Sequence, residues 1–455
     1  TMTAPLTLAL WAARRHVGDI THDPLEGGWT LAYAPAWLAD PQAWPLSPAL
    51  PLKPPDGGYP PASVRRFLEN LLPEGRALDI VAANRGVAKS NVFGLIRALG
   101  TETTGAIRFL PPGEDGRLDP PAQPWREVSL KELDERIAIR AQRPFVEWDG
   151  QVRMSIAGYQ DKLPVFIDGD PADCGRLVLP DWPLASTHLL KPQPDEPGVP
   201  HMVVNEHFCM RLAHVLGLPV AEVSLLRTPR PVLVVQRFDR VVHRGANEGH
   251  VRVERRHIID TCQAADLPVS YKYERHIGSS GPAALYRDGV SLPRLFGQLD
   301  HVVRKAAGKL AMLRWALFQF VIGNCDAHGK NFSFFVEPAG LATAPWYDQV
   351  SVVQYPRFSH EMAMAFGDEF NLDEVKAFAL AQFARRCGID RQLMVRESRR
   401  LRDGVAAHAL PLAQGASYDT EERTFAEQVA AFALDQAKRL HEAAREAARI
   451  GEDYL

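Results

Sequence analysis

Cysteine is scarce in this chain. Five cysteines are scattered over 455 residues, and no two of them form a Cys-x-x-Cys pair. An odd, scattered set does not build a disulfide framework, and structural zinc sites usually need closely spaced pairs. The sequence therefore argues against a structural zinc site and indicates a protein of a reducing cytoplasm.

Long apolar runs and a strong charge of one sign are also missing. No apolar stretch reaches the length of a membrane span, and the N-terminus lacks the charged and apolar segments of a secretion signal. The net charge is −3, so no global positive field points to nucleic acid. We expect no membrane contact, and any DNA contact has to be local or supplied by a partner.

A Walker-type phosphate loop is absent as well, since Gly-x-x-x-x-Gly-Lys-Ser/Thr does not occur. The segment Ser155-Ile-Ala-Gly-Tyr-Gln-Asp-Lys162 lies between two expected strands and holds one glycine. By itself this segment is typical of a hairpin turn.

The most informative segment present is Gly323-Asn-Cys-Asp-Ala-His-Gly-Lys-Asn-Phe-Ser333. Asn331 follows Asp326 at the spacing of the protein-kinase catalytic loop, where the Asp accepts the substrate hydroxyl proton and the Asn holds Mg²⁺. Asp348 follows an expected hairpin, where a kinase keeps its main metal ligand. Hard oxygen ligands of this kind suit Mg²⁺ and phosphoryl transfer.

Taken alone, the same segment reads equally well as a polar turn, because Gly, Asn and Asp favour turns. The context favours the catalytic interpretation. Residues 310–322 are almost wholly apolar and predict a buried helix that stops at Gly323-Asn324. Such a helix would hold the polar loop rigidly at the end of a core element.

Other parts of a phosphotransferase have weaker signals. Lys191 ends an apolar strand, where a cation is costly unless it meets an anion such as ATP phosphate; a solvated strand end is the alternative. Glu206 is either a partner of Lys191 or a carboxylate favoured by a helix N-terminus. His328 is expected to orient the loop. The Arg-rich stretches, 237–256 and 396–402, read most simply as solvated faces, and a local DNA or phosphate patch is the alternative.

The expected fold class is α+β, with a small N-terminal α/β subdomain before a two-lobed protein-kinase-like fold whose C-terminal lobe is mostly helical. A Pro- and Gly-rich stretch at 111–124 suggests a boundary. We expect three domains, at 1–120, 121–240 and 241–455. Asn205 is expected to cap a helix ending at His214. Further helices are expected at 63–72, 76–84, 90–99, 257–265, 291–306, 309–322, 373–386, 390–402 and 420–448.

The motifs, in their order, resemble the HipA family of toxin kinases from about residue 6 to 400. The matching pieces are Ser-Ile-Ala-Gly-x-Gln-x-Lys, Thr-His-x-x-Lys-Pro, Asn-Glu-x-x-x-x-x-Leu-Ala, Arg-Phe-Asp-Arg, Lys-Tyr-Glu at 272–274, Gly-Asn-x-Asp-Ala-His-x-Lys-Asn-Phe-Ser and Tyr-Asp-x-x-Ser. His16-Val-Gly18, Pro45-Leu-Ser-Pro48 and the stretch 67–75 resemble the family's first domain.

The resemblance implies residue roles in an ATP- and Mg²⁺-dependent serine/threonine protein kinase. Asp326 would be the catalytic base, and Asn331 and Asp348 would bind Mg²⁺. Ser155 would be an autophosphorylation site that silences the enzyme. The remaining nucleotide-site residues would be Ala157, Gly158, Tyr159, Gln160, Asp161 and Lys162 in a phosphate loop, Lys191 on the phosphates, Gln236, Arg237 and Phe238 in the hinge, and His328, Lys330 and Tyr347 beside the nucleotide.

The resemblance also implies partners: a HipB-like helix-turn-helix antitoxin, operator DNA through that complex, and an aminoacyl-tRNA synthetase, typically the glutamyl one, as the phosphorylated substrate. The residues are also compatible with two other functions. One is a small-molecule kinase with the same machinery. The other is a catalytically weak corepressor that acts with the antitoxin on DNA.

Overall fold

The computed structural model describes residues 5–100, 102–118, 125–153, 160–172, 175–245 and 251–455. The chain divides into two compact units. The first unit comprises Thr1–Pro192, Leu226–Ile259 and Phe334–Leu341, and the second comprises Gln193–Leu225, Asp260–Ser333 and Ala342–Leu455. The expected division into three domains stays a prediction.

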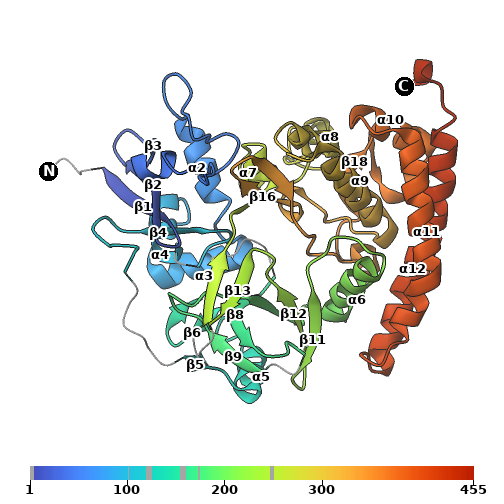
Figure 1. The fold of residues 1–455 in the computed structure, drawn as a ribbon. Helices are drawn as coiled ribbons and strands as arrows, with labels where there is room; N and C mark the ends of the chain where they lie inside the picture. Colours follow the sequence, from blue (N-terminus) through green and yellow to red (C-terminus); the bar gives the residue numbers. More distant parts are fainter. Residues whose placement is uncertain (1–4, 101, 119–124, 154–159, 173–174, 246–250) are drawn as a thin grey trace. The chain divides into compact units, whose positions relative to one another are not determined.

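The first unit begins with a four-stranded antiparallel sheet in the order β3-β2-β1-β4 (Figure 1). Its strands are β1 (Leu6–Ala12), β2 (Arg15–Asp23), β3 (Gly28–Tyr33) and β4 (Ile107–Leu110). Leu8 and Leu10 are fully buried, as the alternating pattern predicts for one face of a strand. The helices of this part are α1 (Pro35–Leu38), α2 (Pro61–Glu69), α3 (Gly75–Arg85) and α4 (Val92–Leu99), and the last three confirm the helices expected here.

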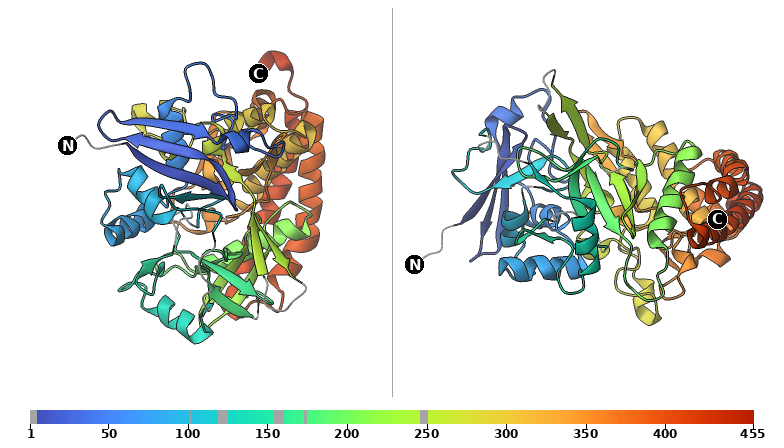
Figure 2. Two further views of the ribbon diagram at one scale, coloured as in Figure 1. Left: turned by 60° about the vertical axis from the view of Figure 1, so that its left-hand side comes forward. Right: turned by 90° about the horizontal axis from the view of Figure 1, so that it is seen from below.

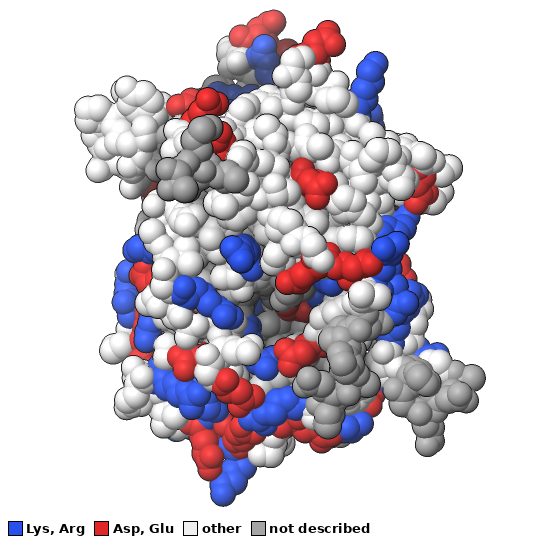
Figure 3. Space-filling view, turned by 90° about the vertical axis from the view of Figure 1, so that its left-hand side faces the viewer, with Lys and Arg blue, Asp and Glu red and all other residues white. Residues whose placement is uncertain are grey.

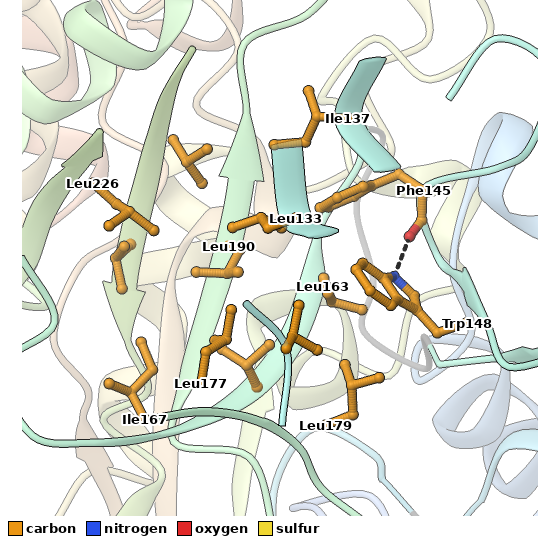
Figure 4. Packing of buried hydrophobic residues seen from close by; sticks show 14 residues of the cluster. Leu133, Ile137, Phe145, Trp148, Leu163, Ile167, Leu177, Leu179, Leu190 and Leu226 are labelled. Atoms are coloured by element: carbon orange, nitrogen blue, oxygen red, sulfur yellow. Dashed lines mark hydrogen bonds between the residues drawn. The ribbon is translucent and has the colours of Figure 1, made fainter. Parts of the chain in front are cut away.

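A second sheet of the first unit has the strand order β11-β12-β10-β8-β9-β5. Its strands are β5 (Arg126–Glu127), β8 (Leu163–Asp168), β9 (Arg176–Leu179), β10 (His188–Pro192), β11 (Val223–Arg227) and β12 (Pro231–Gln236). Helix α5 (Leu130–Ala138) and the short pair β6 (Glu147–Trp148) and β7 (Gln151–Val152) lie close by in sequence. Figure 4 shows the apolar core of this region, where the Trp148 indole donates to the Phe145 carbonyl at 2.7 Å. This core fixes strand β10, in which Lys191 is the residue before the last.

The chain then forms the hairpin of β13 (Arg240–Arg244) and β14 (Val251–Arg255), and a three-stranded sheet of β15 (Ile258–Asp260), β16 (Ser333–Glu337) and β17 (Gly340–Thr343). The helix expected at 257–265 is wrong in its first half. Residues 258–260 are a strand, because Val336 donates its N–H to the His257 carbonyl at 3.0 Å. Only α7 (Thr261–Ala264) is helical there, and Asp260 caps it.

The second unit is mostly helical. Its helices are α6 (Met202–Val215), α7, α8 (Leu292–Gly297), α9 (Lys305–Ile322), α10 (Ala377–Arg386), α11 (Arg391–Ala413) and α12 (Thr420–Ala447), with a hairpin of β18 (Glu361–Phe366) and β19 (Glu369–Asn371). Figures 1 and 2 show α11 and α12 running side by side. A capping box begins α12, since Asp419 and Glu422 exchange side-chain to backbone hydrogen bonds.

Several expected helix boundaries are wrong. The helix expected at 390–402 continues as α11 to Ala413, and the helix expected at 373–386 begins as α10 at Ala377. Helix α6 begins at Met202, so Asn205 lies inside it. The Asn205 side chain instead bonds the N–H and C=O of Ser351 and the Tyr355 hydroxyl, which are distant in sequence. The helix expected at 291–306 ends early: α8 stops at Gly297, and a short 3₁₀ turn follows to Asp300.

The solvated-face interpretation of the Arg-rich stretch 237–256 is also wrong for its key members. The side chains of Arg237, Arg240 and Arg255 are only 5%, 0% and 5% exposed. They surround the Glu102 and Asp239 carboxylates. On the face drawn in Figure 3, by contrast, Lys and Arg side chains are intermingled with Asp and Glu.

A membrane-spanning helix has to be both long and apolar. None of the helices in the described part of the chain combines the length and apolar character that crossing a bilayer requires.

Candidate functional site

The polar loop of the second unit starts where α9 ends. Gly323 terminates α9 with a left-handed φ of 66°. A Cβ at this position would lie 2.5 Å from Val353 and 2.7 Å from Phe432, so both the backbone angle and the close packing require glycine. The loop then runs through Asp326 to a single 3₁₀ turn at Gly329–Asn331. The predicted buried helix and its stop are thereby confirmed.

Asn331 and Asp348 meet across the β16–β17 hairpin. The Asn331 side-chain nitrogen donates to Asp348 Oδ2 at 3.3 Å, and Asn331 Oδ1 accepts from the His328 N–H at 3.0 Å. Among the described residues, no group of three or more His, Cys, Asp and Glu side chains could hold a metal ion. Mg²⁺ does not need such a group, because it commonly takes one or two carboxylates and completes its shell with water and phosphate oxygens. The Asp348 carboxylate and the Asn331 amide fit that requirement.

Asp348 has a left-handed backbone, with a φ of 53°. Aspartate tolerates this region better than most residues, but it still stores strain that the surroundings must hold. A buried amide network does so: Asn324 Nδ2 donates to the Asp348 carbonyl at 3.3 Å and to Gln319 Oε1 at 2.8 Å. Gln349 Nε2 donates to the Tyr347 carbonyl at 2.6 Å, while its Oε1 accepts from Gln319.

His328 and Tyr347 stabilise the loop through hydrogen bonds to its backbone. His328 Nδ1 accepts from the Lys330 N–H at 3.2 Å, so its proton sits on Nε2. Burial, with the nearby Lys272 and Lys330 cations, holds the pKa of His328 well below its ordinary value of 6.5. The neutral ring therefore orients the loop. The Tyr347 hydroxyl donates to the Lys330 carbonyl at 2.6 Å, and burial raises its pKa well above 10.

Lys330 and Cys325 flank the expected base. The Lys330 ammonium, 5% exposed, donates to Asp260 Oδ2 at 2.5 Å. Burial raises the pKa of the Cys325 thiol to about 12, so this cysteine is not a thiolate nucleophile at neutral pH. Asp326 is exposed between buried neighbours, and the Tyr273 hydroxyl donates to its Oδ1 at 2.6 Å. An exposed carboxylate on a rigid loop can accept a proton from an incoming hydroxyl group.

The other expected nucleotide residues that the structure describes lie in the first unit. Leu163 on β8 pairs with Leu190 on β10, so Lys162 and Lys191 come next to each other at one end of these strands. Both lysines are buried, at 4% and 5% exposure. Gln160 and Asp161 precede them and are half-buried, whereas Ser155, Ala157, Gly158 and Tyr159 lie outside the described residues.

The expected hinge follows β12. Gln236 is exposed, and Phe238 makes an edge contact with Phe335 at 5.9 Å between ring centroids. The Arg237 guanidinium points inward, donating to Ser186 Oγ at 2.8 Å and to both Asp239 oxygens. Contact of this side chain with a nucleotide stays a prediction, as do the roles of Gln236 and Phe238.

Sequence reasoning missed two sets of residues at the site. One is the amide network of Gln319, Asn324 and Gln349, whose signal was a glutamine inside an otherwise apolar helix. The other is Tyr273, which lies in the Lys-Tyr-Glu motif but had no role assigned. Nothing local in the sequence connects Tyr273 to Asp326.

Comparison with known families and proteins identifies the chain. The HipA-like C-terminal domain model matches residues 154–409, and the HipA N-terminal domain model matches residues 8–110. The chain belongs to the HipA family.

Relatives within the HipA family extend over nearly the whole chain. It is 39% identical over 412 residues, 90% of each chain, to the serine/threonine-protein kinase toxin HipA of Shewanella oneidensis. It is 37% identical to the putative kinase Y4mE of Sinorhizobium fredii, over 88% of this chain and 90% of the relative. A solved complex of Shewanella oneidensis HipA with HipB and operator DNA matches with a TM-score of 0.85 and 36% identity, covering 98% of this chain and 100% of that chain.

These matches confirm the expected family and the α+β, kinase-like fold. As a HipA-family member the chain is a serine/threonine protein kinase, homologous to the kinase toxin of a toxin–antitoxin system.

Proposed function

We propose that this chain transfers the γ-phosphoryl group of ATP to serine or threonine hydroxyls of a protein, with Asp326 as the catalytic base. The observation that carries the proposal is that one rigid loop presents an exposed carboxylate, Asp326, and an amide, Asn331, that reaches Asp348. In the transfer, the acceptor oxygen bonds to phosphorus as the bond to ADP breaks, and the acceptor proton passes to the Asp326 carboxylate.

The metal requirement follows from the donor set. The Asp348 carboxylate and the Asn331 side chain would hold Mg²⁺, which when bound neutralises phosphate charge and orients the reacting group. The amide network behind Asp348 keeps its strained backbone in place. This pre-organisation matters because phosphoryl transfer relies mainly on positioning and electrostatics.

The nucleotide roles proposed for the first unit rest on buried charge. Lys191 lies buried on β10, and Lys162 lies buried just before the neighbouring strand β8. Buried cations are favoured close to anions. We assign both to ATP phosphates, and Gln236, Arg237 and Phe238 to the hinge. The segment from Ala157 to Lys162 would form the phosphate loop, and phosphorylation of Ser155 would switch the enzyme off.

In the cell we propose a cytoplasmic toxin, restrained by a HipB-like helix-turn-helix antitoxin. The complex would bind operator DNA, by analogy with the solved Shewanella oneidensis complex of HipA, HipB and operator DNA. A net charge of −3 is consistent with DNA binding that depends mainly on the partner. The proposed substrate is an aminoacyl-tRNA synthetase of the glutamyl type, whose phosphorylation would stop translation. A small-molecule kinase is the alternative enzyme, and a catalytically weak corepressor is the alternative binding protein.

The test is transfer of label from γ-labelled ATP to protein in a cell lysate, with Mg²⁺ present. Asp326→Asn and Asp348→Asn should each abolish transfer, and chelation of Mg²⁺ should do the same. Label in small molecules rather than protein would favour the metabolite kinase. Equal incorporation by the native chain and Asp326→Asn would contradict the proposed catalytic role.

A further inference from the structure

Tyr273 contacts the proposed catalytic base directly. Its hydroxyl donates to Asp326 Oδ1 at 2.6 Å. Its ring also meets the His328 ring edge to face, with centroids 5.1 Å apart and planes at 87°. We propose that Tyr273 is a positioning residue that fixes the Asp326 carboxylate for proton transfer, an inference that rests on the proposed role of Asp326.

The backbone around Tyr273 is held on both sides. The Gly329 N–H of the catalytic loop donates to the Lys272 carbonyl at 2.8 Å, and the Glu274 N–H donates to the Ala363 carbonyl on β18 at 2.9 Å. The Ala363 N–H in turn donates to the Cys325 carbonyl at 2.8 Å, next to Asp326. Tyr273 therefore belongs to a strip of chain, residues 271–274, that lies between the catalytic loop and β18.

Gly289 shows how closely this strip is packed. A Cβ at Gly289 would lie 1.8 Å from the Tyr273 carbonyl oxygen, so no other residue fits without moving the tyrosine backbone. The Gly289 N–H also donates to the Glu274 carbonyl at 3.2 Å.

A buried carboxylate beside Tyr273 anchors the strip. Glu274 is 2% exposed; it accepts from Arg287 Nε at 2.6 Å and from the Ala365 N–H at 2.8 Å. Arg287 also pairs with Asp368 at 2.6 Å, and Arg386 pairs with the same carboxylate. A buried charge with several partners is costly to disturb, so this network keeps Tyr273 in register with the loop.

The chemical consequence concerns the orientation of the Asp326 carboxylate. The hydrogen bond from Tyr273 to Oδ1 restrains the rotation of the carboxylate that receives the acceptor proton. Such a donor also favours the charged form of a carboxylate, which is the form that acts as a base. An orienting group behind a catalytic base is a recurrent arrangement in enzyme sites.

The test replaces Tyr273 with phenylalanine in the full chain. Tyr273→Phe removes only the hydroxyl, and we expect kcat to fall about tenfold, the equivalent of one lost hydrogen bond of about 1.4 kcal/mol. The KM for ATP should stay unchanged. The acidic limb of the pH–kcat profile should move to higher pH, because the carboxylate loses a donor that favours its charged form.

Tyr271→Phe is the matched control. Tyr271 lies in the same strip and stacks on His276 at 3.8 Å, a contact that phenylalanine keeps, so its kcat and profile should match the native chain. An unchanged kcat and profile in Tyr273→Phe would overturn the inference. So would equal losses in both variants, or phosphate found on Tyr273 itself. If Asp326→Asn stays active, the proposed function fails first, and that outcome is distinct from the others.

Discussion

Asn324 donates its side-chain amide to the backbone carbonyl of Asp348 at 3.3 Å, which joins the end of α9 to the proposed metal ligand. The link matters because Asp348 holds a left-handed backbone with a φ of 53°. Asn324 is itself held by a hydrogen bond to the Gln319 side chain. The support therefore acts on the Asp348 backbone, while the Asp348 carboxylate faces Asn331.

Asn324→Ala should therefore weaken Mg²⁺-dependent activity. Loss of the amide leaves buried groups unpaired and releases the strained Asp348 backbone, at a cost of about 1–3 kcal/mol. We expect the Mg²⁺ concentration for half-maximal phosphorylation to rise about tenfold, measured by metal titration at saturating ATP. Asn371→Ala, on the β19 side of the second unit, is the control and should titrate as the native chain does. A native Mg²⁺ requirement in Asn324→Ala would show that the network does not support the metal site.

A second prediction concerns the buried charges next to the expected hinge. Burial alone would raise the pKa of Glu102, but Arg255, Arg240 and Arg237 lower it below its ordinary 4.5. Removing one partner of a buried ion network commonly costs about 3–5 kcal/mol, because the remaining charges lose their compensation. Glu102→Gln should lose that much unfolding free energy in chemical denaturation, whereas Glu114→Gln, at an exposed site, should lose almost none.

The sign of the pH dependence at Glu102 follows from its lowered pKa. A carboxyl group whose pKa is lower in the folded chain than in the unfolded chain contributes stability above its unfolded pKa. That stability is lost as the pH falls from the unfolded pKa toward the folded pKa. The difference in stability between the native chain and Glu102→Gln should thus be largest near neutral pH and shrink below about pH 4.5. A constant difference across that range would contradict this account.

A third prediction uses His257, which is buried against Trp44 and the Leu46 carbonyl. Burial lowers the pKa of His257 to about 4 from 6.5. The unfolded chain then binds a proton that the folded chain excludes, so stability falls as pH drops from about 6.5 toward 4.

His257→Gln should flatten that fall, because glutamine can offer an N–H to Leu46 without titrating. The measurement is the free energy of unfolding at several pH values, with His243→Gln at an exposed position as control. If the slope of His257→Gln equals that of the native chain, His257 does not contribute to the pH dependence.

Local patterns predicted much of this fold because their causes are local. The Asp419 capping box, the Gly323 helix stop and the alternating strand around Leu8 depend on neighbours a few residues away. The spacing from Asp326 to Asn331 likewise placed both residues in one loop.

The residues whose roles were not predicted depend on contacts that are distant in sequence. Asn205 looked like a cap, but its partners Ser351 and Tyr355 lie far along the chain. The sequence suggested that Arg237 and Arg240 face solvent. The folded chain instead brings Glu102 and Asp239 beside them. Tyr273 was overlooked for the same reason, since its contact with Asp326 spans 53 residues.

The central claim is that Asp326 makes this chain a protein kinase. The most direct measurement is mass-spectrometric mapping of phosphorylated sites in cells that express the native chain or Asp326→Asn. The account predicts phosphate on Ser155 and on serine or threonine residues of a cellular protein with the native chain, and none of these sites with Asp326→Asn. The same set of phosphorylated sites in both samples would contradict it.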